Sequence, residues 1–125
     1  MAVAALVLLI GPAVWQAVWR VQHPAPLGRS AAEVDSALAR LLPVGTSLDS
    51  TEALLHVLGI AYSVIEPDDQ NATRDTIAAG GPIVMAGLQE LDTKLFITEG
   101  AGIRLAFDPS RRLARRKVEP WFTGL

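Results

Sequence analysis

The chain contains no cysteine, which excludes disulfide bonds, thiolate metal sites, a cysteine nucleophile and lipid attachment through cysteine. It has only two histidines, His23 and His56, and neither lies in a pattern typical of a catalytic triad or a metal site. The formal net charge of -2 argues against a general nucleic-acid-binding protein. With these classes set aside, the pattern of apolar residues is the main guide to the fold and function.

An uncharged segment, Ala2–Trp19, stands at the start of the chain. As a helix it would be about 27 Å long, enough to cross the apolar core of a bilayer. Trp15 and Trp19 stand where aromatic residues gather at a membrane interface, and Arg20 follows them. The sequence therefore favours a transmembrane anchor over residues 1–20. A cleaved signal peptide and a buried helix are the alternatives.

Residues 21–29 contain two prolines and a glycine, so we expect an extended linker between the anchor and the rest of the chain. Residues 30–125 are then long enough for one domain. The orientation of the anchor stays open. Arg20 and Arg29 follow the apolar segment, and the positive-inside rule taken literally would place the domain in the cytoplasm.

Two helices are expected at the start of this domain. Ser30 and Glu33 form a capping box for the first, whose apolar face holds Val34, Leu38, Leu41 and Leu42. The second follows the short link 43–45, with Thr46 as its N-cap, Asp49 three residues later, and Gly59 as a left-handed stop. Its apolar stripe is Leu48, Leu54, Leu55 and Leu58. Each helix has one apolar face, so the pair must cover another layer.

Later segments predict that this layer is an antiparallel sheet. Strands are expected at residues 60–66, 94–99, 103–107 and 113–119, with a short strand and then an irregular edge within 76–89. Turns are expected at 67–71, 100–102 and 108–111, and Pro120 should end the last strand. Because Leu113 and Val118 would face opposite sides, that strand should carry a bulge or lie at an edge.

The predicted fold class is therefore α+β. It comprises an N-terminal transmembrane helix, followed by a two-layer sandwich of a helix hairpin packed on an antiparallel β-meander.

Residues able to support chemistry are scattered, and the sequence predicts no catalytic, cofactor or metal site. His56 follows Glu52 by four residues, the spacing of a surface pair on a helix. Asp68, Asp69 and Asp75 surround a turn that lacks the glycine and spacing of a calcium-binding EF-hand loop, so solvated carboxylates are favoured. A small hydrolase that joins His56 to one of these carboxylates is the least favoured function.

The densest charged run lies near the C-terminus and comprises Arg111, Arg112, Arg115, Arg116 and Lys117. In a strand, Arg115 and Lys117 would point to one side and Arg116 to the other. Two interpretations stay open. The run is either a charged edge that resists pairing with other chains, or a surface for anionic lipid headgroups or an acidic partner. No aromatic ladder accompanies the arginines, so nucleic acid is not favoured.

Gly45-Thr46 and Leu58-Gly59 bracket the second helix, and a Phe107-Asp108 turn precedes the last strand. With the anchor and helix hairpin, these features resemble the BamE family of bacterial envelope proteins, also called SmpA/OmlA. The resemblance implies a non-catalytic scaffold or interaction domain in the cell envelope. Together with the apolar segment 2–19, the resemblance predicts single-pass attachment to the inner membrane, with the domain facing the periplasm. The expected partners are the membrane, through residues 2–19, and another envelope protein, with no cofactor.

Overall fold

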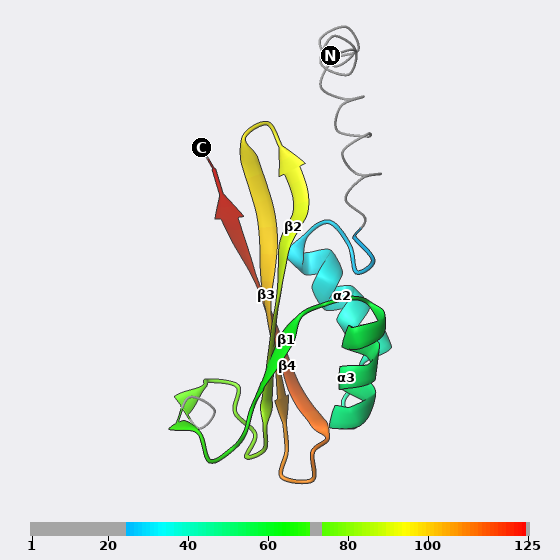
Figure 1. Ribbon diagram of the computed structural model, residues 1–125, viewed down its shortest axis with the longest axis vertical. Coiled ribbons are helices and arrows are strands. Elements are labelled where there is room, and N and C mark those ends of the chain that lie inside the picture. Colours follow the sequence, from blue (N-terminus) through cyan, green and yellow to red (C-terminus); the bar gives the residue numbers. More distant parts are fainter. Residues whose placement is uncertain (1–24, 71–73, 125) are drawn as a thin grey trace, which may run out of the picture.

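The computed structural model describes residues 25–70 and 74–124, in which two helices pack on a four-stranded antiparallel sheet (Figure 1). The helices are α2 (Ala31–Leu41) and α3 (Leu48–Val57). The strands are β1 (Tyr62–Ile65), β2 (Ile83–Lys94), β3 (Ile97–Phe107) and β4 (Leu113–Thr123), and they neighbour one another in chain order. The predicted α+β class and meander are thus confirmed.

The predicted transmembrane segment, residues 2–19, lies outside the described part of the chain. Among residues 25–70 and 74–124, no helix combines the length and the apolar character that a membrane span requires.

Helix α2 begins as its sequence predicts. The Ser30 side chain accepts a hydrogen bond from the Glu33 N–H at 3.2 Å. The Glu33 carboxylate accepts one from the Arg29 N–H at 3.0 Å, so the return bond of the capping box reaches one residue before the cap. Leu38 and Leu42 are buried, but Leu41 is 46% exposed, and its assignment to the apolar face was wrong.

Helix α3 begins one residue later than expected. Ser47, not Thr46, is the N-cap, and its side chain accepts from the Ser50 N–H at 3.2 Å. The reason is tertiary: the Thr46 carbonyl accepts a hydrogen bond from the Leu113 N–H at 2.8 Å, which holds Thr46 beside β4. Gly59 ends the helix with a φ of 71°, as predicted.

The middle of the sheet differs most from expectation. β2 is a continuous strand of 12 residues between β1 and β3, where a short strand followed by an irregular edge was predicted. Its pairing with β3 shifts register between Leu88 and Asp92. The β2–β3 turn lies at Leu95–Phe96, not at Gly100–Gly102, because Lys94 pairs with Ile97. Residues 100–102 are inside β3, and so the prediction of a turn there was wrong.

Strand β4 lies at an edge of the sheet and carries a bulge, so both alternatives for its uneven pattern are confirmed. Phe107 pairs with Leu113 and Ala106 with Arg115, which leaves one extra residue in β4. The strand continues through Pro120, contrary to expectation. An edge strand tolerates proline because one row of its backbone groups has no neighbouring strand.

The main core lies between the helices and the sheet, and its fully buried side chains include Leu38, Leu55, Leu105 and Phe107. A second, small cluster forms on the opposite face, where Ile83 and Ala106 contact Ile77 and its neighbours from the β1–β2 connection. The helices cover only part of the sheet, since the β2–β3 hairpin extends beyond them (Figure 1).

Candidate functional site

The five basic residues of the 111–117 run do not form one patch. Arg111 and Arg112 belong to the β3–β4 turn. The Arg111 guanidinium lies 3.5 Å from the Glu66 carboxylate, and both side chains are about half exposed. The Arg112 guanidinium donates a hydrogen bond to the Gly45 carbonyl at 3.0 Å. This end of the run therefore ties the turn to neighbouring loops.

The strand part of the run alternates between the two faces, as predicted. On the helix side, Arg116 Nε lies 2.7 Å from Asp35 Oδ1, which connects β4 to α2. On the opposite face, Arg115 donates to the Ala78 carbonyl at 3.3 Å. Lys117 Nζ, on the same face as Arg115, lies 2.8 Å from Glu119 Oε1. Each basic side chain thus has a partner within the domain.

Sequence reasoning missed a charge cluster centred on Arg104 in β3. The Arg104 guanidinium contacts Asp75 Oδ2 at 3.0 Å and Glu119 Oε1 at 3.3 Å. No sequence pattern indicates this cluster, because Asp75 and Arg104 are 29 positions apart. The contacts hold the β1–β2 connection against the face of the sheet that lies opposite the helices.

The carboxyl groups of this cluster favour their charged forms. Burial of Asp75 opposes its ionisation, but the Ile77 N–H and the Arg104 guanidinium outweigh burial and hold its pKa below the usual value. The pKa of Glu119 is lowered mainly by its hydrogen bond with Lys117 and by the charge of that side chain. These shifts follow from ion pairs that stabilise the fold.

The Asp108 side chain organises the β3–β4 turn. Its Oδ1 accepts hydrogen bonds from the Ser110 hydroxyl at 2.6 Å, the Ser110 N–H at 2.9 Å and the Arg112 N–H at 3.1 Å. The bond from the Ser110 hydroxyl contributes most to lowering the pKa of Asp108. The predicted turn is present, and Arg111 within it has a φ of 63°.

The residues weighed for catalysis are not brought together. His56 is exposed on α3, and the neighbouring Glu52 accepts a hydrogen bond from the Tyr62 hydroxyl at 3.1 Å. Burial, followed by that contact, raises the pKa of Tyr62. Asp75 lies on the other face of the sheet, with Arg104. Within residues 25–70 and 74–124, no group of three or more His, Asp or Glu side chains could hold a metal ion.

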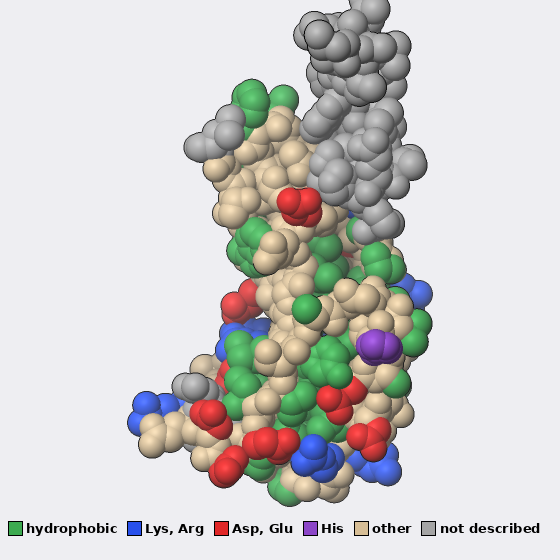
Figure 2. All heavy atoms as spheres, in the orientation of Figure 1, with side chains coloured by type: hydrophobic (Ala, Val, Ile, Leu, Met, Phe, Trp, Pro, Cys, Tyr) green, Lys and Arg blue, Asp and Glu red, His purple; other side chains and the backbone are tan. Residues whose placement is uncertain are grey.

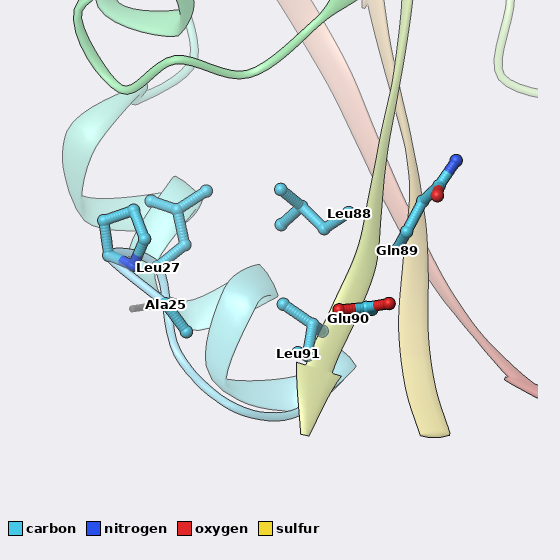
Figure 3. A pocket seen from close by; sticks show the side chains of 7 residues that line it. Ala25, Leu27, Leu88, Gln89, Glu90 and Leu91 are labelled. Atoms are coloured by element: carbon cyan, nitrogen blue, oxygen red, sulfur yellow. The ribbon is translucent and has the colours of Figure 1, made fainter. Parts of the chain in front are cut away.

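The segment that leads into α2 packs against the upper half of β2. Leu27 and Leu91 are almost fully buried, and with Leu88 they line a pocket of about 80 Å³ (Figure 3). Leu27 and Leu88 point toward one another across it, and Ala25 lies at its margin. The Arg29 guanidinium donates to the Leu91 carbonyl at 3.1 Å. The core thus begins within the predicted linker, and the entry of the chain into the domain is fixed at β2.

Beyond this pocket, the end of the sheet exposes four large hydrophobic side chains, which we call the apolar end. They are Leu95, 82% exposed, Phe96, 71%, Ile97, 55%, and Phe122, 62%. Figure 2 shows hydrophobic atoms over the tip of the hairpin. Alternation in residues 94–99 predicted a strand there and not a turn, so sequence reasoning did not find this surface.

Comparisons of the chain with family models, curated proteins and solved structures gave no match. The resemblance to the BamE family therefore stays a prediction.

Proposed function

We propose that this protein is a membrane-tethered, non-catalytic interaction domain of the bacterial cell envelope. The observation that carries the proposal is the location of the apolar end. It lies at the same end of the sheet as the point where the chain enters the domain, and the uncharged segment 2–19 precedes that point. An anchored domain with exposed apolar side chains near its anchor suits binding to membranes or membrane proteins.

The roles of the charged residues support this proposal. Arg104, Asp75 and Glu119 attach a loop to the sheet, and Arg116 attaches a helix to it. Among the described residues, every buried side-chain nitrogen or oxygen atom has a hydrogen-bond partner. The polar groups with shifted pKa values are thus accounted for by the stability of the fold.

The alternative function is binding of anionic lipid or an acidic partner through Arg111, Arg112, Arg115, Arg116 and Lys117. It receives less support, because these side chains contact carboxylates or backbone carbonyls of the domain itself. A partner would have to compete with those contacts, and the two faces of β4 divide the charge.

Two measurements on the full chain test the proposal. After alkaline carbonate washing of membranes, the chain should remain in the pellet, whereas recovery in the supernatant would contradict the anchor. A pull-down from solubilised bacterial membranes should then recover a stoichiometric envelope protein. Recovery that is lost in Phe96→Ser but kept in Val57→Ser would assign the contact to the apolar end, because Val57 is a similarly exposed residue on α3.

A further inference from the structure

We infer that the apolar end inserts into the headgroup region of the lipid bilayer beside the anchor. This inference rests on the proposed function, because it requires the tether. It adds a lipid-contact site formed by Leu95, Phe96, Ile97 and Phe122, which the sequence alone did not indicate.

The exposure of this cluster is unusual. Of the eight large hydrophobic side chains that are exposed among the described residues, four gather in the apolar end. Leu95 also has a φ of 54°, a left-handed conformation that is rare for leucine. Such a residue at an exposed turn contributes little to the core, while its apolar side chain projects from the tip. A contiguous apolar patch at a tip marks a contact with lipid or protein.

The length of the tether places the apolar end near the membrane. Ala25 follows Trp19 by six positions, so this stretch spans at most about 22 Å. Ala25 lines the same pocket as Leu91, and Leu95, just past the end of β2, is four residues further on, about 13 Å away at strand spacing. The tip can therefore reach the bilayer while the predicted anchor spans it.

The opposite end of the sheet is less well placed to face the same bilayer. Glu99 pairs with Asp92, next to Leu91, and the strand continues to Phe107, about 26 Å further from the entry point. This distance exceeds the longest reach of the tether, so the tether disfavours an orientation in which the β3–β4 turn points straight at the membrane. The favoured orientation therefore places the apolar end against the membrane.

The composition of the apolar end suits an interface more than an anionic surface. Trp121 is an aromatic residue of the kind that gathers at membrane interfaces. Its ring packs over Gly100, three residues from Ile97. Lys94 is exposed beside Leu95 and can extend its amine toward headgroups. The carboxylate of Glu99 is held by the Ala31 N–H at 2.9 Å and points to the helix. Insertion should thus depend on apolar contact and tolerate salt.

The absence of native cysteine permits a direct test on the full chain. Phe96→Cys or Leu95→Cys would carry an NBD fluorophore, and Val44→Cys and Val57→Cys would be matched controls at 74% and 79% exposure. The proteins would be reconstituted in vesicles of phosphatidylethanolamine and phosphatidylglycerol. Lipids with a nitroxide close to the headgroup would serve as quenchers. Flotation after an alkaline wash would report the tether separately.

We expect NBD at positions 95 and 96 to emit at shorter wavelength and to lose emission to the shallow quencher, in low and high salt. An insertion depth of about 5–10 Å would make a deep quencher less effective. Positions 44 and 57 should not change. Floating protein without quenching at 95 and 96 would overturn the inference and leave the tether intact. A shorter wavelength without quenching would overturn the inference and assign the site to contact with a second copy of the chain. Protein that does not float would overturn both proposals.

Discussion

The substitution Gly81→Ala tests how the β1–β2 connection is attached to the sheet. Gly81 is buried, and its N–H donates to the Phe107 carbonyl at 2.9 Å. The Phe107 N–H returns a bond to the Pro82 carbonyl at 2.9 Å. A Cβ at Gly81 would overlap the Asp108 carbonyl oxygen and lie 2.6 Å from the Phe107 oxygen. The backbone at Gly81 would therefore have to move away from the backbone at Phe107 and Asp108.

The expected cost follows from those contacts. Phe107 is fully buried, so the strand cannot move away without disturbing the core. Loss of two hydrogen bonds, one of them leaving a buried group without a partner, should lower the free energy of unfolding by about 2–4 kcal/mol. For a domain of this size, the melting temperature should fall by roughly 10–25 °C.

The assay is urea unfolding of the full chain in detergent micelles, followed by circular dichroism. Gly87→Ala is the matched control, because a Cβ there meets no atom within 4 Å. A glycine inside a strand costs about 0.5–1 kcal/mol relative to alanine, so this control should be neutral or slightly stabilising. Equal unfolding midpoints for Gly81→Ala and the unaltered chain would refute the close approach. Equal losses in both variants would show that the strand itself requires glycine.

Three further predictions concern the entry segment and the ion pairs. A chain that lacks residues 1–24 should melt cooperatively, whereas removal of 1–27 should cost about 1.5–3 kcal/mol in urea unfolding because buried Leu27 is lost. The lowered pKa of Asp75 stabilises the fold above the usual carboxyl pKa, and this contribution is lost as pH falls through the lowered value. Between pH 5 and pH 2, the urea midpoint of Asp75→Asn should therefore fall less than that of the unaltered chain. Arg116→Glu should lower the free energy of unfolding by about 0.5–1 kcal/mol, because the new carboxylate repels half-exposed Asp35. Arg115→Glu should lower it less, and equal losses in the two variants would contradict the assignment of Arg116 to the helix side.

Local signals predicted the helices well. The Ser30 cap and the Gly59 stop depend on bonds within a few residues, and such bonds are visible as short sequence patterns. The error at Thr46 shows the limit of these patterns. Thr46 and Ser47 are both residues that cap helices, and a contact of Thr46 with Leu113, far along the chain, favours Ser47.

Glycine caused the largest errors in the sheet. Gly100 and Gly102 suggested a turn, but Gly100 lies in a strand where the Trp121 ring occupies the space of a side chain. Gly81 likewise provides room for the Asp108 carbonyl. A glycine required by close packing and one required by a turn look the same in sequence. Contacts with β4 and with the β3–β4 turn, which lie later in the sequence, therefore decide that these glycines belong to extended backbone and not to turns.

The candidate surfaces were difficult to predict for a related reason. The basic run was evident, but its partners were not, because Asp35 is 81 positions from Arg116. The apolar end depends on the placement of the β2–β3 turn, which alternation in residues 94–99 predicted incorrectly.

The dimensions of the two layers explain why an apolar end remains uncovered. Helices of 11 and 10 residues would extend about 30 Å even end to end, whereas β2, with 12 residues, extends about 40 Å. The Ala31 N–H binds Glu99, so α2 begins at that level, and the hairpin continues past it. Phe122 pairs with Glu99, and Ile97 lies two residues before Glu99, so both side chains share the helix-side face. Phe122 lies level with the start of α2, and Ile97 lies past it. An uncovered strand end in water favours polar residues on both faces. Two large apolar side chains at this end of the helix-side face are what the proposed lipid contact requires, and the predicted anchor would make the bilayer the nearest apolar surface.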